Sequence, residues 1–313
     1  AYMISVHLYW NNICILHRQE LAFLEQIKTR LKQNGIDLTV TCFGLGYGTH
    51  MSDYLREPEA VIPDMIVSTD LEVFEDERIF DRFKGDLLPL ADLIPQKKDP
   101  VTAALRRKAS LLPYLAIPLV FYADKRICSG SSPLSFDTLC ESKTPPVFGG
   151  ISNSAAKTVV KALWQSKGSQ AVKTLLSSAV ITDMPIQAFR RVQTGESSLA
   201  LVPSVYALRA DGISTAALWP ADGAVAIPSY ICARNTIPVI AAAAVVKELF
   251  SQELSSFYVK NGNLISCAPE SPCPDFSSLT SQEHPPLRVL SEEFLSRLSA
   301  EEFYQIYQSI TSH

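Results

Sequence analysis

The chain has 313 residues, of which 47% are hydrophobic and 19% charged, and its formal net charge is -4. So large an apolar fraction can build two lobes with cores of their own, and it argues against a disordered chain. The acidic balance argues against a nucleic-acid partner, because such a partner requires a basic face. No apolar run reaches the roughly 20 residues that a membrane-spanning helix needs.

Strand and helix patterns alternate over the first part of the chain. Short β-rich runs predict three strands, at residues 4–9, 38–43 and 63–67. Apolar positions at helical spacing predict a helix from about residue 18 to residue 34, and the loop 44–50 leads into another. This alternation is typical of a mostly parallel sheet, in which ligands collect at the carboxyl ends of the strands.

A second set of strands and helices follows. Strands are expected at residues 116–122, 147–150 and 199–202. Helices are expected at about residues 152–165, 169–177 and 185–194, with a short helix starting at residue 133. Pro118 lies within the first of these strands, which favours an edge strand or a segment that crosses between lobes over a central strand.

The remaining pattern completes a two-lobed α/β organisation. A strand at 224–227 is expected to return the chain to the first lobe, where helices over 239–250 and 252–259 should pack. Two amphipathic helices are expected within 290–310. We therefore expect residues 1–118 and 223–313, the C-terminal helices included, to form the first lobe, and residues 119–222 to form an inserted second lobe.

Seven cysteines occur, so at least one thiol is unpaired in a monomer. None forms a C-x-x-C pair, and therefore neither a zinc site nor a redox motif is indicated. Cys14, Cys42 and Cys232 lie in apolar runs, where small buried side chains are expected. The thiol count and the lack of a visible secretory leader keep a cytoplasmic location open.

Five segments resemble, in order and spacing, the type II periplasmic solute-binding proteins of ABC importers, close to the ferric-iron, phosphonate and polyamine group. They are residues 63–70 (PDMIVSTD), 116–122 (AIPLVFY), 149–155 (GGISNSA), 195–204 (GESSLALVPS) and 219–224 (WPADGA). The resemblance implies two α/β lobes joined by two crossing strands, with a ligand cleft between them. It also implies a small-molecule ligand, an ABC permease as partner, a monomer, an extracytoplasmic location (periplasm or cell-surface lipoprotein) and no cofactor.

Candidate ligand contacts lie at the expected strand ends and helix starts. Free N–H groups at a helix start suit an oxyanion, so a small polar and anionic ligand is expected, although ordinary capping explains any single site. The rings of Trp10 and Tyr206 are able to stack on a ligand. The candidate set comprises Trp10, Asn11, Tyr47, Gly48, Thr49, Ser68, Thr69, Ser152, Asn153, Ser154, Tyr206 and Asp222.

Metal binding is an alternative that the resemblance brings with it. Ferric-binding relatives usually hold the ion with a pair of adjacent tyrosines plus His or carboxylate groups. The equivalent stretch here, residues 203–207, has Tyr206 alone, and this departure puts iron in doubt. If a metal binds, His50 and Asp222 are expected to join Tyr206 as ligands, because hard donors suit ferric ions.

Two further classes are an enzyme and an intracellular ligand-sensing domain of the same fold. The sequence has no G-x-S-x-G, H-E-x-x-H or P-loop motif, so no enzyme is expected. A thiaminase-like enzyme would use a cleft cysteine with an acid nearby, and neither Cys128 nor Cys140 has an evident base partner. Two sets of charged residues are predicted to lie on the surface. One is acidic, Glu72, Glu75 and Asp76, and is interpreted as a solvated helix face. The other is basic, Arg106, Arg107 and Lys108, and a contact with the permease is its alternative interpretation.

Overall fold

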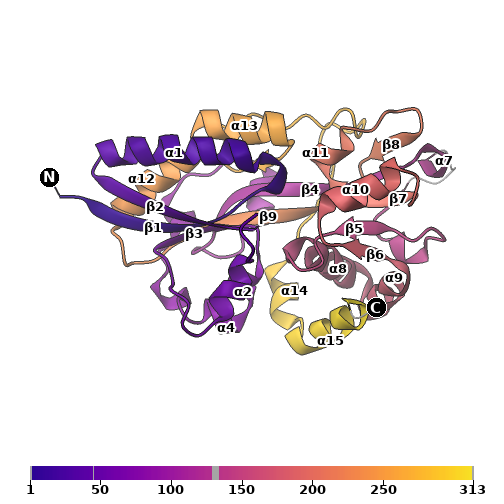
Figure 1. The fold of residues 1–313 in the computed structure, drawn as a ribbon, viewed down its shortest axis with the longest axis horizontal. Coiled ribbons are helices and arrows are strands. Elements are labelled where there is room, and N and C mark those ends of the chain that lie inside the picture. Colours follow the sequence, from indigo (N-terminus) through magenta and orange to yellow (C-terminus); the bar gives the residue numbers. More distant parts are fainter. Residues whose placement is uncertain (1, 45, 129–133, 312–313) are drawn as a thin grey trace. The chain divides into compact units, whose positions relative to one another are not determined.

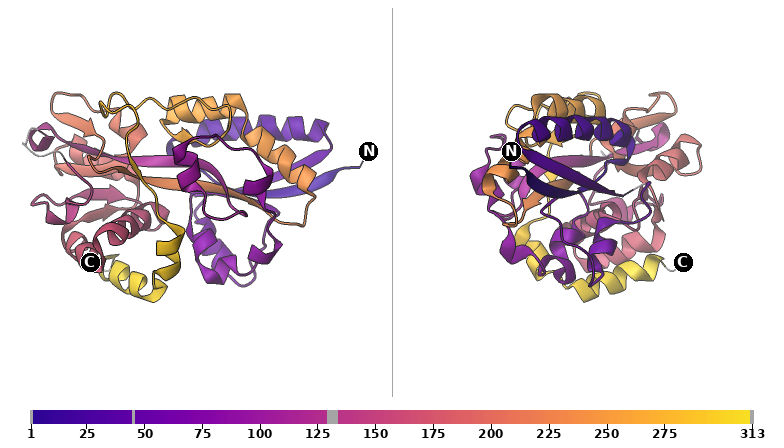
Figure 2. Two further views of the ribbon diagram at one scale, coloured as in Figure 1. Left: turned by 180° about the vertical axis from the view of Figure 1, so that it is seen from behind. Right: turned by 60° about the vertical axis from the view of Figure 1, so that its left-hand side comes forward.

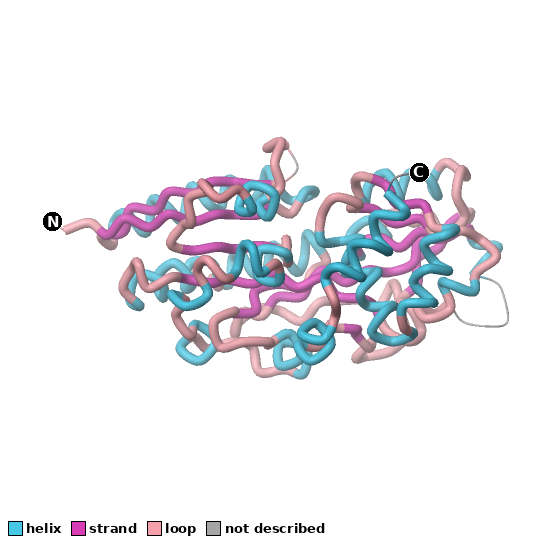
Figure 3. The backbone as a smooth tube through the Cα atoms, turned by 90° about the horizontal axis from the view of Figure 1, so that it is seen from below, coloured by secondary structure: helices cyan, strands magenta, loops and turns pink. Residues whose placement is uncertain are grey.

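The computed structural model describes residues 2–44, 46–128 and 134–311, and the chain divides into two compact units. Unit 1 contains Ala1–Ala116 and Pro228–Pro274, and unit 2 contains Ile117–Ile227 and Asp275–His313. Strands β4 (Leu112–Asp124) and β9 (Ala224–Ala233) each have residues in both units, and the chain passes between the units a third time after Pro274. Helices and strands alternate within each unit (Figure 3).

Three parallel strands form the framework of unit 1. Strand β1 (Ile4–Asn11) lies between β2 (Ile36–Phe43) and β3 (Met65–Ser68), and β9 continues the sheet antiparallel to β3. In this register Asn11 pairs with Phe43 and Ser68 pairs with Tyr230. The carboxyl ends of β1, β2 and β3 therefore lie at one edge of the sheet.

Helices cover both faces of this sheet (Figure 1). One face carries α1 (His17–Gln33), α12 (Val239–Leu249) and α13 (Gln252–Gly262), and the other carries α2 (Met51–Arg56), α3 (Glu72–Glu75) and α4 (Glu77–Phe80). Alternation along β1 separates two aromatic residues between the faces. Tyr9 joins the apolar cluster of α2 to α4, whereas Trp10 packs edge-on against Tyr114 at 6.2 Å. The shorter elements of unit 1 are Cys14–Leu16, Lys84–Asp86, α5 (Leu90–Leu93), α6 (Pro100–Leu105) and β10 (Ile265–Ser266).

Unit 2 has the strand order β4-β7-β5-β6, with β5, β6 and β7 parallel and β4 antiparallel to β7. Its strands are β5 (Val147–Gly149), β6 (Val180–Thr182), β7 (Leu199–Pro203), β8 (Thr215–Leu218) and β11 (Leu287–Arg288). Its helices are α7 (Lys125–Cys128), Leu139–Glu141, α8 (Ser154–Lys167), α9 (Ser169–Ser178), α10 (Pro185–Gln193), α11 (Ser204–Ala207), α14 (Glu292–Arg297) and α15 (Ala300–Thr311).

Alternation along β4 builds the two sides of unit 2. Phe121 enters the main core together with residues of α8 and α9, whereas Tyr122 faces α10 and stacks on Phe189 at 4.6 Å. Helices α8, α9, α14 and α15 gather on the same side of β5 and β6 (Figures 1 and 2). The expected helix start at residue 133 falls partly outside the described residues.

The C-terminal helices correct one expectation, since they belong to unit 2 and not to the first lobe. Phe303 and Tyr307, four residues apart on α15, are buried in the core of unit 2. Phe303 lies 6.2 Å from Trp164, and Tyr307 donates a hydrogen bond to the carbonyl of Ile151 at 2.6 Å. The amphipathic pattern reveals an apolar face, but it does not say which core that face covers.

Of the two interpretations of Pro118, the crossing segment is confirmed, because β4 passes from unit 1 to unit 2 between Ala116 and Ile117. The edge strand is wrong, because β4 lies between β9 and β7 in the strand order. Pro118 falls between the residues that pair with β10, which end at Ala116, and those that pair with β7, which start at Leu119. Proline has no N–H to donate, but neither of these two pairings uses a residue at position 118, so neither loses a hydrogen bond.

Two negative findings concern the described part of the chain. None of its helices combines the length and apolarity that a membrane span requires. Its cysteines from Cys42 onward are free thiols; Cys232 is buried and Cys42 partly exposed, and the side chain of Cys14 lies outside the description.

Candidate functional site

The carboxyl edge of the unit 1 sheet brings two of the expected residues together. Asn11, the last residue of β1, donates a hydrogen bond from Nδ2 to Oγ1 of Thr69 at 2.8 Å. The loop after β2 packs closely beside them, because a Cβ at Gly44 would lie 2.4 Å from Oδ1 of Asn12. Gly44 also has a φ of +108°. Glycine therefore suits this position both because a Cβ would clash with Asn12 and because its backbone adopts positive φ without strain.

Residues 46–49 of that loop are open to solvent. Tyr47 is 41% exposed, and its hydroxyl lies 2.7 Å from Nε2 of His17. At Gly48 a Cβ would meet nothing within 4 Å, and Thr49 is exposed. His50 precedes α2 without a capping bond from its side chain. Gly48 and Thr49 can therefore reach a ligand without displacing a packed neighbour, whereas Tyr47 would have to give up its contact with His17.

Ser68 has a structural contact instead. Its side chain is fully buried, and Oγ accepts a hydrogen bond from the backbone N–H of Asp70 at 2.9 Å. Asp70 Oδ2 in turn accepts from the backbone N–H of Ser52 at 2.9 Å, which ties the start of α2 to the end of β3. Because both groups are already used within the fold, Thr69 is the more available of the two adjacent candidates.

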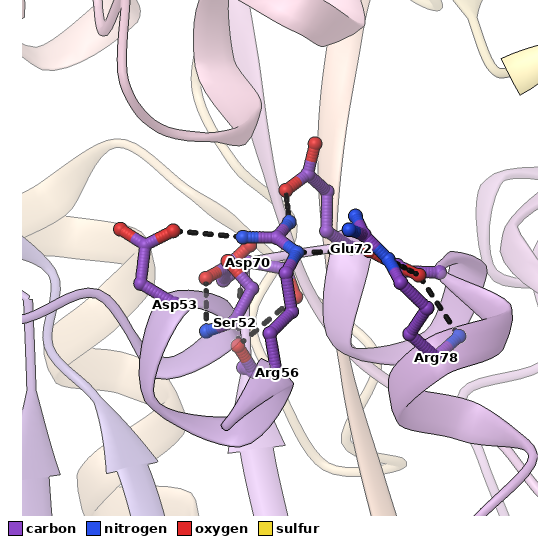
Figure 4. Close-up of polar contacts among 8 residues, drawn as sticks. Ser52, Asp53, Arg56, Asp70, Glu72 and Arg78 are labelled. Atoms are coloured by element: carbon purple, nitrogen blue, oxygen red, sulfur yellow. Dashed lines mark hydrogen bonds and ion pairs between the residues drawn. The ribbon is translucent and has the colours of Figure 1, made fainter. Parts of the chain in front are cut away.

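A cluster of ion pairs stands next to this edge and corrects the interpretation of the acidic residues as a solvated face. Arg56 contacts Asp53 at 2.7 Å, Asp76 at 2.8 Å and the carboxylate of Glu72 (Figure 4). The side chains of Glu72 and Asp76 are 6% and 10% exposed. Burial alone would raise the pKa of Asp76, but hydrogen bonds from Arg78 and Arg56 outweigh it and lower the pKa to about 2.

Trp10 belongs to the core of unit 1. Its side chain is 2% exposed, so its ring does not stand free to stack on a ligand. Beside it lies a carboxylate that the sequence did not single out, Glu20, which accepts hydrogen bonds from the N–H of Ile13 at 2.8 Å and from Tyr258 at 2.6 Å. Burial raises the pKa of Glu20 to about 7, although these hydrogen bonds act against the rise.

In unit 2 the loops after β5 and β7 start side by side, because these parallel strands pair Phe148 with Leu201. Asn153 is the N-cap of α8, and its Oδ1 accepts a hydrogen bond from the N–H of Ala155 at 2.7 Å. Gly150 makes room for it, since a Cβ there would lie 2.4 Å from that oxygen. Ser152 is exposed and Ser154 is buried.

Tyr206 lies on α11, directly after β7, and is 5% exposed. Its ring lies 6.0 Å from the ring of Phe189, and the guanidinium of Arg209 lies 5.8 Å from its centroid. Side chains of unit 2 therefore cover the ring that the sequence suggested for stacking.

Asp222 holds unit 2 together. Its carboxylate accepts hydrogen bonds from the N–H groups of Phe136 at 2.7 Å and Asp137 at 2.9 Å, and it pairs with Arg288 at 2.7 Å. The carboxylate thus joins the segment before the Leu139–Glu141 helix to strand β11. Because both oxygens of Asp222 already have partners within unit 2, we do not assign this residue to the ligand site.

The three candidate metal ligands do not form a cluster within either unit. His50 belongs to unit 1, whereas Tyr206 and Asp222 belong to unit 2. Among residues 2–44, 46–128 and 134–311, no group of three or more His, Cys, Asp or Glu side chains is placed to hold a metal ion.

Two α/β units joined by crossing strands define the class of type II periplasmic binding proteins. The chain belongs to the family of bacterial extracellular solute-binding proteins, whose family model matches residues 60–296. The resemblance and the fold class expected from the sequence are thereby confirmed.

Solved structures share the fold at low identity. Iron-bound HitA from Pseudomonas aeruginosa is 17% identical, with 98% of this chain and 99% of that chain covered and a TM-score of 0.66. The ferric binding protein from Campylobacter jejuni is 14% identical, with 97% and 99% covered and a TM-score of 0.69. A periplasmic thiamin binding protein is 16% identical, with 99% and 97% covered and a TM-score of 0.62. No curated protein sequence matches this chain.

Proposed function

We propose that this protein is a receptor that captures a small polar solute and presents it to the permease of an ABC importer. Membership in the extracellular solute-binding family supports this role. The observation that carries it is the placement of polar residues at the carboxyl ends of parallel strands in each unit, Asn11 and Thr69 in unit 1 and Ser152 in unit 2.

In this proposal the solute binds between the two lobes, which close on it about the crossing strands. A solute stabilises the closed state only through contacts that it makes better in that state than in the open one. We propose that unit 1 contributes Asn11, Thr69 and the exposed loop residues Tyr47, Gly48 and Thr49, and that unit 2 contributes the start of α8 at Ser152, Asn153 and Ser154.

The solute is proposed to carry an anionic group. Helix α8 has 14 residues, and its cap Asn153 accepts from the N–H of Ala155, one of the first N–H groups of the helix. The remaining N–H groups of a first turn attract an oxyanion, and the helix dipole adds to that attraction. The receptor is proposed to act as a monomer outside the cytoplasm; the family gives no support to an intracellular sensor, and no catalytic role is proposed.

Ferric iron is the second candidate, because the similar structures reported above include an iron-bound HitA and a ferric binding protein. The covered ring of Tyr206 and the single tyrosine of this segment weigh against it. Titration with ferric citrate separates the candidates, since tyrosine coordination of ferric iron produces a visible charge-transfer band. A band that is lost in Tyr206→Phe would favour iron over the organic anion.

The receptor role is tested by thermal-shift screening against amino acids, phosphonates, phosphate esters, polyamines and thiamin derivatives. A stabilising solute should also reduce the radius of gyration measured by small-angle X-ray scattering. Asn11→Ala should weaken binding, whereas Asn34→Ala, at the end of α1, serves as the matched control. A panel that produces neither stabilisation nor compaction would overturn the proposal.

A further inference from the structure

Arg107 is buried, contrary to the surface position expected from the sequence. Its side chain is 5% exposed, and it lies in unit 1 between α6 and β4. Nη1 of Arg107 donates to Oε1 of Glu75 at 3.0 Å. The guanidinium carbon lies 5.5 Å from the centroid of the Tyr230 ring, so one face of the guanidinium is covered by an aromatic ring.

Two of the donors of this guanidinium lack a partner. Nε and Nη2 of Arg107 are buried and make no hydrogen bond. A buried donor without a partner has lost its hydrogen bonds to water, and this loss destabilises the fold more when the group is charged, so such atoms in native proteins call for an explanation. Within the described chain, Arg234 and Arg288 each have one buried donor of this kind, whereas Arg107 has two on the same side chain.

The two free donors form one binding edge. In a planar guanidinium, Nε–H and the neighbouring Nη2–H point to the same side, at a spacing that matches two oxygens of a carboxylate or phosphate. Glu75 accepts a hydrogen bond from the remaining nitrogen, Nη1, and the Tyr230 ring packs against the face of the guanidinium. The edge is therefore fixed in orientation before any ligand arrives, which reduces the entropy lost on binding.

The edge is connected to the candidate site of unit 1 through Tyr230. Tyr230, on which Arg107 stacks, pairs with Ser68, the last residue of β3. The Tyr230 hydroxyl donates to the carbonyl of Leu105, which anchors the segment that carries Arg107. Thr69, next along the chain from Ser68, bonds Asn11. Sheet register thus connects the arginine to the strand ends that we assign to the solute.

We propose that the Nε–Nη2 edge of Arg107 binds an oxyanion, the carboxylate or phosphate group of the captured solute. The inference rests on the proposed receptor function and adds a specific anion contact in unit 1. The donors are covered in this structure, so the bound group is enclosed and the covering residues move aside when it enters. Enclosure from water strengthens the charge-assisted hydrogen bonds that result.

Binding of inorganic phosphate and of acetate, measured by calorimetry and thermal shift at constant ionic strength against chloride, tests the proposal. Wild type should be stabilised by at least one of these anions, and the arm that responds identifies phosphate or carboxylate as the recognised group. Arg107→Met, which removes the donors at similar length, should weaken binding at least tenfold. Arg107→Lys keeps the positive charge but lacks the two adjacent guanidinium donors, so it should weaken anion binding less than Arg107→Met does. If Arg107→Met does not fold, Arg107→Lys takes its place in the test.

Arg106→Met is the matched control, because Arg106 is the adjacent residue, 44% exposed and paired with Asp92. It should bind both anions as wild type does. A purely structural Arg107 predicts equal destabilisation with and without anion, so the loss of the anion-dependent increment separates the two roles. No anion effect in wild type, or the same effect in Arg107→Met, would overturn the inference.

The outcomes keep the two proposals apart. A solute that compacts the protein and binds Arg107→Met as tightly as wild type would remove the anion contact and leave the receptor function supported. Phosphate binding that depends on Arg107, without compaction by any solute in the panel, would support the contact and count against the receptor function.

Discussion

Glu20 accepts a hydrogen bond from Tyr258 at 2.6 Å although both side chains are fully buried. The other oxygen of the carboxylate accepts a hydrogen bond from the N–H of Ile13, two residues after the strand end at Asn11. This pair therefore links helices α1 and α13 to the start of the candidate site in unit 1.

The contribution of Glu20 to the stability of the protein should fall as pH rises from about 4.5 to about 7. Burial raises the folded-state pKa of Glu20 from its ordinary value of 4.5 to about 7. In this window the folded state retains a proton that the unfolded state has released, so the free energy of unfolding decreases with pH. The full contribution is roughly 3 kcal/mol. Urea unfolding at several pH values measures it, and Glu20→Gln should flatten this part of the profile; an unchanged profile would contradict the assignment.

Removing the cap of α8 should destabilise the protein by about 1 kcal/mol. Asn153→Ala deletes the oxygen that accepts from the N–H of Ala155. The unfolding midpoint in urea measures the change, and Ser152→Ala, at the exposed neighbour, should leave it near the wild-type value. Equal effects of the two substitutions would mean that the cap contributes nothing specific.

Asp222→Ala should lower stability by about 1–3 kcal/mol or more, since it leaves two backbone N–H groups without their acceptor and leaves Arg288 paired with Asp137 alone. Asp222→Asn keeps an acceptor and should cost less. Thermal unfolding provides the measurement. If Asp222 instead contacted the solute, the alanine variant would lose binding while its melting temperature stayed unchanged.

Gly44→Ala and Gly48→Ala form a matched pair in one loop. Both positions have positive φ, +108° and +78°, but a Cβ would meet Asn12 at 2.4 Å only at Gly44. The strain of positive φ alone costs about 1–2 kcal/mol, so Gly48→Ala should lose about that much and Gly44→Ala clearly more. Unfolding free energies of the two variants give the comparison, and a reversed order would show that the packing at Gly44 adjusts freely.

The fold was largely predictable from the sequence. Short apolar runs bounded by Gly, Pro and Asp form buried strands whatever their position in the sheet. Strands β1, β2, β3, β5 and β7 begin and end close to the expected residues. Side-chain direction was harder. Tyr9 and Trp10 alternate between two faces that are both covered by helices, so a ring at a strand end is no guide to exposure.

The candidate site was predictable only in part. Asn11 and Thr69 meet because parallel strands end at one edge, a consequence of fold class. Arg107 and Asp76 were misplaced on the surface because their partners Glu75 and Arg56 come from other elements. Long-range ion pairs of this kind leave no periodic trace in the sequence, and a run of like charges is normally solvated.

The three passages of the chain between the units have a consequence for biosynthesis. Neither unit is one continuous stretch: unit 1 needs residues up to Pro274, and unit 2 needs the segment after it. During translation, strand β9 cannot add to β3 until most of the polypeptide has left the ribosome. Both cores are thus completed late, and a polypeptide that stops before residue 228 lacks a part of each.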